Sequence, residues 1–222
     1  AKAWRANTAD ELRHFFAKAR RQITTEETLL QEIIPGDGSQ QVSWCAFFRN
    51  GSAHSTLTAR RERQHPREFG RAATYVETIE LPEIEELSER FLKAIGFEGL
   101  VEVEFKRDPR DGQYKLLDVN TRTWGFHTLG AAAGVDFPYL LFADRMGLSV
   151  PGCRAVPGIG WLRWLADTPV SFAHMLGGHV GVRSYLTSLT RTRIESVFSR
   201  HDPLPSLAEL MLLPYLISKK YF

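Results

Sequence analysis

The sequence has little cysteine and no long apolar run. Among its 222 residues only Cys45 and Cys153 are cysteines, and they form no Cys-x-x-Cys pattern. This usage favours a reducing compartment over a disulfide-bonded secreted domain, so we expect a cytoplasmic protein. No apolar stretch approaches the roughly 18 residues that cross a bilayer. We therefore expect no membrane-spanning segment and give membrane association little weight.

An excess of charge of one sign is also missing. Acidic and basic residues nearly balance, leaving a formal net charge of +2. Proteins that bind nucleic acids through the phosphate backbone need a strong basic excess, so we expect no nucleic-acid partner. Apolar residues make up 43% of the chain, which is enough for an ordinary folded core.

Two further features are absent at the level of motifs. The sequence contains neither GxxxxGK[ST] nor GxGxxG, the glycine-rich loops that hold phosphates in two large groups of nucleotide-binding proteins. It also begins without methionine, at Ala-Lys-Ala-Trp-Arg, which resembles the middle of a strand. We expect the chain to be a segment of a longer protein.

The first half of the sequence predicts a helix, a strand and a hairpin. Thr8 and Glu11 form a capping-box pattern ahead of apolar residues at helical spacing. The turn Asn50-Gly51 separates two apolar runs and predicts a hairpin. The expected elements are a helix over about 9–21, a strand over 28–34, hairpin strands over 42–48 and 53–58, and an irregular loop over 60–71.

The second half predicts another hairpin between helices. Pro82 begins a helix that carries glutamates in its first turns and is followed by Gly96. The remaining expected elements are strands over 100–105 and 114–119, a helix over about 127–146, a strand over 160–165, and helices over 170–176 and 207–213. This order predicts an α+β fold with largely antiparallel sheets.

The hairpin between residues 100 and 120 carries acidic residues on one face. Polar and apolar residues alternate along its first strand, so Glu102 and Glu104 leave the same face. If the hairpin closes symmetrically about residue 111, Glu104 lies opposite Asp118 and Glu102 lies opposite Asn120. Opposed like charges destabilise a sheet, so a cation is expected between them.

Carboxylate and amide oxygens of this kind suit Mg²⁺. The alternative is a solvated hairpin face whose acids are neutralised by Lys106 or Arg122. A second alternative is a hydrolase that uses Glu104 and Asp118 as an acid/base pair without any nucleotide.

Two blocks of sequence resemble the ATP-grasp superfamily. Residues 99–136, GLVEVEFKRDPRDGQYKLLDVNTRTWGFHTLGAAAGVD, carry an acid on one strand and an acid-x-Asn-x-Arg motif on the next. Residues 29–36, LLQEIIPG, resemble the strand and hinge that hold adenine in that family. The resemblance covers about residues 1–147.

The resemblance implies an ATP-grasp fold, present in part, and an ATP-dependent carboxylate-amine ligase. In such enzymes Mg-ATP, or Mn-ATP, converts a carboxylate to an acyl phosphate that an amine then attacks. Glu104, Asp118 and Asn120 match the metal ligands of the family. Arg122 matches a catalytic arginine that contacts the acyl or phosphoryl oxygens.

The resemblance also suggests nucleotide contacts. It places Gln31, Glu32 and Ile34 at the adenine, and Arg60, Arg61 and Arg63 over the phosphates. A solvated run of charge explains the three arginines equally well. His127 and Trp124 would lie near the acceptor substrate, although a capping histidine and a buried tryptophan have the same spacing.

The resemblance implies a three-part division. We expect residues 1–58 to be the rest of the small lobe, 59–147 the large lobe with the metal-binding hairpin, and 148–222 an extension of unknown role. The family's phosphate-binding lysine and glycine-rich loop are not recognisable, so an N-terminal lobe is the partner expected to be missing. The other expected partners are a small carboxylate and an amine, and a homodimer is an option. An ATP-binding module without turnover is the alternative function.

Overall fold

The computed structural model describes residues 4–24, 28–36, 38–65, 72–178 and 180–218. The chain divides into two compact units, Ala1–Ile33 and Ile34–Phe222. The first unit contains one helix, whereas the second contains the sheet and all other helices of the described residues.

The helix of the first unit is α1 (Ala9–Ala19), which confirms the expected helix. The Thr8 side chain accepts a hydrogen bond from the Glu11 amide at 3.2 Å, and the Glu11 carboxylate accepts one from the Asn7 amide at 2.7 Å. The first bond satisfies an amide that an isolated helix end leaves open, and the second holds the residue before the N-cap against the first turn. The strand expected over 28–34 is wrong, because these residues have no regular structure and no strand of the described chain pairs with them.

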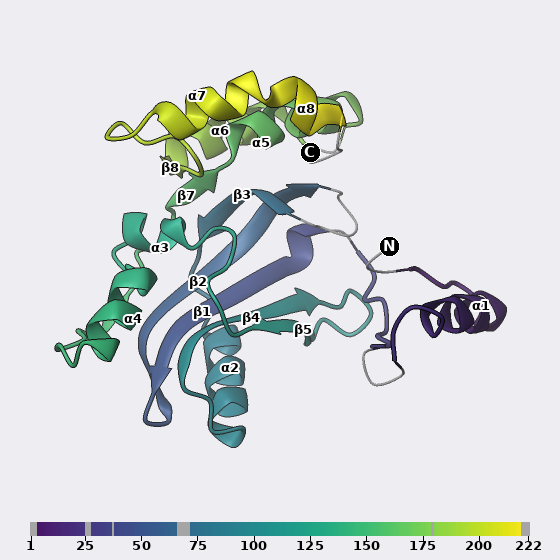
Figure 1. Cartoon of the computed structure of the whole chain (residues 1–222), viewed down its shortest axis with the longest axis horizontal. Helices are drawn as coiled ribbons and strands as arrows, with labels where there is room; N and C mark the ends of the chain where they lie inside the picture. The colour runs from purple at the N-terminus through teal and green to yellow at the C-terminus, as the bar shows by residue number, and fades with distance from the viewer. Residues whose placement is uncertain (1–3, 25–27, 37, 66–71, 179, 219–222) are drawn as a thin grey trace. The chain divides into compact units, whose positions relative to one another are not determined.

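The second unit is built on one sheet with the strand order β5-β4-β1-β2-β3-β7-β8, and β6 pairs with β2 (Figure 1). The β2/β6 and β7/β8 pairs are parallel and the others are antiparallel. The strands are β1 (Gln41–Arg49), β2 (Ser52–His65), β3 (Ala72–Thr78), β4 (Gly99–Arg107), β5 (Tyr114–Asn120), β6 (Cys153–Arg154), β7 (Gly160–Leu162) and β8 (Thr192–Glu195).

The turn between β1 and β2 confirms the first hairpin. Asn50 and Gly51 have φ angles of 51° and 69°, the left-handed region that Asn and Gly adopt at low cost. β2 is longer than expected, and the loop over 60–71 is wrong for residues 60–65. These residues stay in the strand because β3, which the sequence did not predict, pairs with them from Ala59 to His65. Residues 66–71 lie outside the described residues.

Each face of the sheet is covered by a different set of helices. Along β1, Trp44 and Phe48 pack on the face that α2 (Pro82–Ala94) covers through Ile84. Cys45 and Phe47 pack on the opposite face with residues of α3 (Thr128–Ala132) and α4 (Phe137–Arg145). The two-residue period of the strand thus supplies both cores, and the burial of both faces gives the strands their nearly continuous apolar sequence.

The single helix expected over 127–146 is instead two helices. Gly134 has a φ angle of 94°, which ends α3, and Asp136 caps α4 by accepting a hydrogen bond from the Tyr139 amide. A helix cannot continue through a left-handed residue, so the chain turns between them.

The C-terminal region is helical, and Figure 1 shows its four helices grouped beside β7 and β8. The strand expected over 160–165 is confirmed for residues 160–162, and the two expected helices overlap α5 and α7. The three-part division at residues 58 and 147 stays a prediction. No described helix is long and apolar enough to cross a membrane. The helices are α5 (Trp164–Leu176), α6 (Val182–Arg191), α7 (Leu204–Met211) and α8 (Leu213–Ser218), and a short 3-10 turn, η1 (Gly38–Gln40), precedes β1.

The core beneath α4 provides a test of the fold. Phe137 is fully buried, and its ring centroid lies 5.0 Å from that of Trp124. Phe137→Ala should lower the free energy of unfolding by about 3–5 kcal/mol, since it leaves a cavity. Tyr139→Ala, on the exposed side of the same helix, should change it by about 0.5 kcal/mol or less. Urea unfolding measures both, and equal losses would contradict the assigned packing.

Candidate functional site

The register of the acidic hairpin matches the predicted one at Glu102 and Glu104, whereas a β-bulge after Glu104 shifts it by one residue toward the turn. Glu104 pairs with Asp118 and Glu102 pairs with Asn120 across β4 and β5. These residues lie on the face of the sheet opposite α2, because Val101 and Val103 point into the α2 core. The expected gathering of two strands' polar residues on one face is confirmed.

Asn120 holds the two glutamates of β4 together. Its Nδ2 atom donates hydrogen bonds to Glu102 Oε2 at 3.1 Å and to Glu104 Oε1 at 2.9 Å. The hydroxyl of Ser43, on the neighbouring strand β1, donates to Glu102 Oε1 at 2.8 Å. Side chains of three adjacent strands therefore meet at this pair of carboxylates.

Arg61 supplies the positive charge at the same point. A guanidinium nitrogen lies 2.7 Å from Glu104 Oε1 and 3.2 Å from Glu102 Oε1, and the side chain is only 13% exposed. Burial lowers the pKa of Arg61, but the two carboxylates outweigh this effect and raise it overall. Arg61 therefore stays charged. The expectation that Lys106 or Arg122 neutralises these acids is wrong, because the cation beside them is Arg61.

Glu102 is the more buried of the two carboxylates, at 1% exposure. Burial and the nearby Glu104 raise its pKa, whereas Arg61 and the Ser43 hydroxyl lower it. The carboxylate is tolerated in the interior because donors from three side chains satisfy both of its oxygens.

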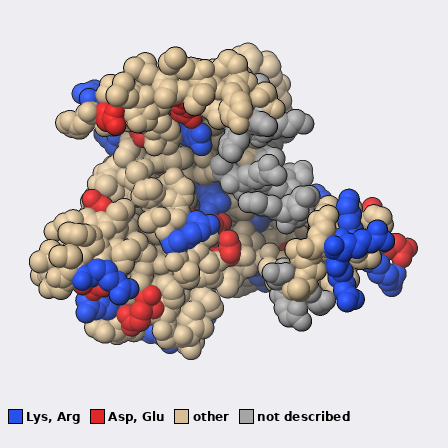
Figure 2. Space-filling model, in the orientation of Figure 1, with Lys and Arg blue, Asp and Glu red and all other residues tan. Residues whose placement is uncertain are grey.

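Asp118 and Arg122 lie at the exposed end of the same hairpin. Asp118 Oδ1 accepts a hydrogen bond from the Val119 amide, and Arg122 donates to the carbonyl of Thr123 at 3.2 Å. Both side chains are exposed. The structure brings Asp118 opposite Glu104 in the ladder but gives Arg122 no contact with the acid pair. In the second unit, Figure 2 shows acidic and basic side chains next to one another near these strands.

The oxygen donors of the hairpin suit a divalent cation in type and number. Glu104, Asp118 and Asn120 offer two carboxylates and an amide oxygen, which are hard ligands. Among the described residues, no three His, Cys, Asp or Glu side chains form a ready metal site. Arg61 and Asn120 instead direct N–H groups at Glu104. The residues fit a magnesium ion once these donors turn away.

The other two arginines of the basic run have different surroundings. Arg60 is exposed and lies 3.5 Å from Glu62. Arg63 is buried, and two of its nitrogens lie 2.8 Å from the oxygens of Asp167. Of the three arginines, Arg61 is the one that reaches the acid pair.

Arg63 also joins the sheet to the C-terminal helices. Its guanidinium lies 4.3 Å from the ring centroid of Tyr75 and 5.1 Å from that of Tyr185, and it donates to Ser188. This packing resembles that of an internal structural arginine. Its expected role at the phosphates stays a prediction.

The residues expected at the adenine fall at the border of the two units. Gln31 and Glu32 belong to the first unit, and Ile34 begins the second. The carbonyls of Ile34 and Gly36 accept hydrogen bonds from Lys106 Nζ at 2.9 and 2.7 Å. Lys106, on β4, thereby ties the start of the second unit to the sheet, a contact that the sequence analysis missed.

His127 and Trp124 follow the hairpin. His127 Nδ1 lies 2.8 Å from the carbonyl of Trp124. A carbonyl can only accept a hydrogen bond, so this contact favours the tautomer that carries its proton on Nδ1. Trp124 is buried in the core beneath α3 and α4. The contacts of both residues are therefore structural ones within the protein, and their roles at the acceptor substrate stay predictions.

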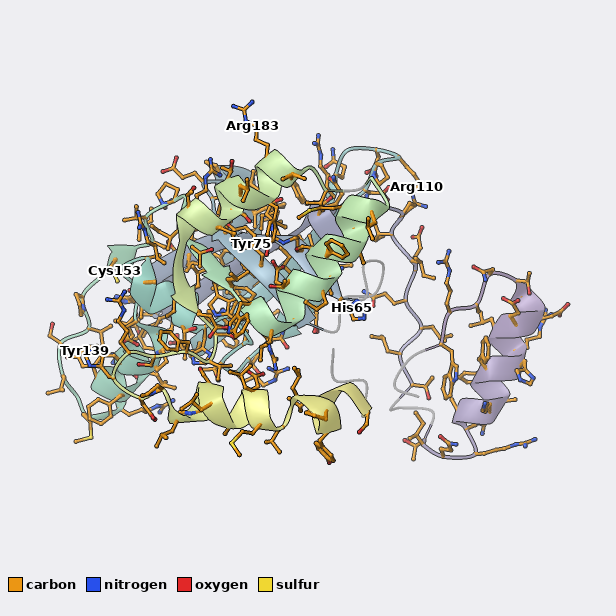
Figure 3. The ribbon with its side chains drawn as sticks, turned by 90° about the horizontal axis from the view of Figure 1, so that it is seen from above. His65, Tyr75, Arg110, Tyr139, Cys153 and Arg183 are labelled. Atoms are coloured by element: carbon orange, nitrogen blue, oxygen red, sulfur yellow. The ribbon has the colours of Figure 1, made fainter. Side chains whose placement is uncertain are left out.

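The structure also has a cavity of about 700 Å³ that no pattern in the sequence predicted. Its wall comes from η1, β2, β3, α5 and α6. Tyr75 lies beneath the C-terminal helices at this place, and Arg183 points outward from α6 (Figure 3). Only tertiary packing brings these segments together, so no local pattern could predict the cavity.

Comparisons with solved structures found several enzymes. N5-carboxyaminoimidazole synthetase from Staphylococcus aureus, complexed with ADP, is 16% identical over 67% of this chain, with a TM-score of 0.47. Biotin carboxylase from Campylobacter jejuni is 16% identical over 65%, also with a TM-score of 0.47. D-alanine–D-alanine ligase from Bacillus anthracis, complexed with ATP, is 18% identical over 79%, with a TM-score of 0.38. The chain covers 39%, 34% and 51% of their respective lengths.

No curated protein matched the sequence. A family model with the description "ATP-grasp in the biosynthetic pathway with Ter operon" matches residues 45–159, more than half of the chain and the whole acidic hairpin. On this match, the chain belongs to that family of ATP-grasp proteins.

Proposed function

We propose that this chain is the metal-binding and phosphate-binding part of an ATP-dependent ligase that joins a carboxylate to an amine. The observation that carries the proposal is the pairing of Glu104 with Asp118 and of Glu102 with Asn120 on one face of the sheet. This hairpin lies inside the segment that matches the ATP-grasp family model.

Glu104, Asp118 and Asn120 are the proposed ligands of Mg²⁺ or Mn²⁺. The bound cation would neutralise the charge that develops on the phosphates during transfer. The side chains need only small rearrangements for this role, because Asp118 is exposed and Asn120 can present its amide oxygen by rotating about its last bond.

In the proposed reaction a substrate carboxylate oxygen attacks the γ-phosphorus of ATP, and ADP leaves. The amine nitrogen then attacks the carbonyl carbon of the acyl phosphate, loses a proton, and phosphate leaves with its bonding electrons. Arg122 is the proposed catalytic residue. Its exposed guanidinium follows the metal-binding strand directly and has a planar fork of donors suited to acyl and phosphoryl oxygens.

We also propose which residues contact the nucleotide. Gln31, Glu32 and Ile34 are the proposed adenine contacts, and Arg61 is the arginine of the basic run best situated for a phosphate. The position of Arg61 supports this role, because its guanidinium lies 2.7 Å from Glu104, a proposed metal ligand.

The metal assignment is tested with Asp118→Asn. This change keeps the size of the side chain and removes one negative charge, so affinity for Mn²⁺ in the presence of ATP should fall by at least about 10–100-fold. Asp111→Asn, in the turn of the same hairpin, is the control, since Asp111 contacts Lys115 instead. Isothermal titration of the natural polypeptide that carries this chain measures both. Equal Mn²⁺ affinities in the two variants would refute the assignment.

The catalytic assignment is tested with Arg122→Ala. Mg-ATP binding should be retained, whereas kcat for ADP release in the presence of carboxylates and amines should fall about 10²–10³-fold, the usual loss for one stabilising donor. Weaker nucleotide binding with unchanged kcat would assign Arg122 to binding instead. Mg-ATP binding by the wild type without any ADP release would favour an ATP-binding module without turnover.

A further inference from the structure

The two glutamates of β4 differ in how completely the protein satisfies them. Glu102 Oε1 accepts hydrogen bonds from Ser43 and Arg61, and Glu102 Oε2 accepts one from Asn120. At 1% exposure, this carboxylate has little room for a metal ion. Glu104 is more accessible, with 13% of its side chain exposed. Its Oε1 atom forms an ion pair with Arg61 and accepts a hydrogen bond from Asn120. Glu102 is thus the fixed partner of Arg61, and Glu104 is the exchangeable one.

We propose that Arg61 is the resident cation of the acid pair and that it exchanges partners when the metal–nucleotide complex binds. In the empty site Arg61 bridges Glu102 and Glu104. In the loaded site Glu104 turns to the metal, and Arg61, still anchored by Glu102, turns to the phosphates. This inference rests on the proposed function, because it takes Glu104 as a metal ligand.

Charge is the reason for the exchange. A divalent cation bound to Glu104 Oε1 would lie within a few ångströms of the guanidinium now 2.7 Å from that oxygen, and like charges at such distances repel strongly where water is scarce. A polyphosphate removes the conflict, because it offers Arg61 new anionic oxygens in a geometry that suits a guanidinium.

The surroundings of Arg61 allow its guanidinium to move a short distance but hold it near Glu102. Its Nε atom is buried and has no hydrogen-bond partner among the described residues, so the present position leaves a donor unsatisfied. The Phe126 ring, with its centroid 5.9 Å away, lies against one side of the guanidinium. The buried Glu102 carboxylate lies 3.2 Å from the guanidinium and holds it in place. These contacts limit Arg61 to a small movement around a fixed anchor.

The consequence is a coupling between metal and nucleotide. Metal alone must displace Arg61 from Glu104 and leave a buried guanidinium half paired, which opposes binding. Metal with nucleotide meets no such penalty. The wild type should therefore bind metal weakly by itself and much more tightly with ATP.

Arg61→Met tests the exchange, because Met keeps an unbranched side chain and removes the charge. Affinity for Mn²⁺ alone, measured by electron paramagnetic resonance of the free ion, should rise about tenfold, and affinity for ATP in the presence of Mg²⁺ should fall about tenfold, within the usual range of coupling between sites. Arg154→Met is the control, because it removes an exposed arginine on β6 whose partner, Glu85, lies on α2 away from the acid pair. It should change neither affinity more than about twofold.

Arg61→Lys keeps the measurement decisive if the Met variant does not fold. Lysine retains the charge but not the forked donors, so the Mn²⁺ affinity should still rise, by less than in Arg61→Met. Unchanged or weaker binding of Mn²⁺ alone in the folded variant, with normal Mg-ATP binding by the wild type, would overturn the exchange. Failure of the wild type to bind Mg-ATP would contradict the proposed function and the exchange together.

Discussion

The ion pair between Arg61 and the glutamates of β4 is the interaction on which the central sheet depends. A carboxylate as buried as Glu102 is stable only when donors replace its lost water. Those donors come from β2, β1 and β5, so the pair fixes the mutual register of four strands. β1 lies between the arginine and the acids, and it carries the small residue Ser43 where the Arg61 side chain must pass to reach β4.

The same strands are covered on both faces of the sheet. The strands that carry the polar pair on one face place Trp44, Val101 and Val103 on the other, where α2 covers them. On the polar face, α3 and α4 cover the apolar part through Phe137 and leave the acid pair at the margin of that core. A polar site thus lies beside a dry core, and side chains that are locked by packing hold its geometry.

The sequence predicts the hairpin well because its information is local. Alternation with a period of two and a turn near residue 111 predict the pairing of Glu104 with Asp118, although the ladder reaches it through a β-bulge after Glu104 that the sequence did not predict. The contact between Arg61 and Glu102 spans 41 residues, and that between Arg63 and Asp167 spans 104. No local pattern encodes contacts between residues so far apart in the sequence. The same limit hid β3, and with it the extension of β2, since a polar and basic stretch becomes a strand only when a neighbour pairs with it.

On the proposed assignment, the charges of the site explain why nucleotide and metal should bind as one ligand. The site holds three acidic residues, Glu102, Glu104 and Asp118, and a single arginine, Arg61, beside two of them. The remaining excess repels a polyphosphate that arrives alone, and the presence of Arg61 at Glu104 opposes a metal that arrives alone. A metal–nucleotide complex meets neither obstacle, because its cation matches the excess of acid and its phosphates match the arginine. On this proposal, one buried arginine would make the acidic site selective for a metal–nucleotide complex over either of its parts.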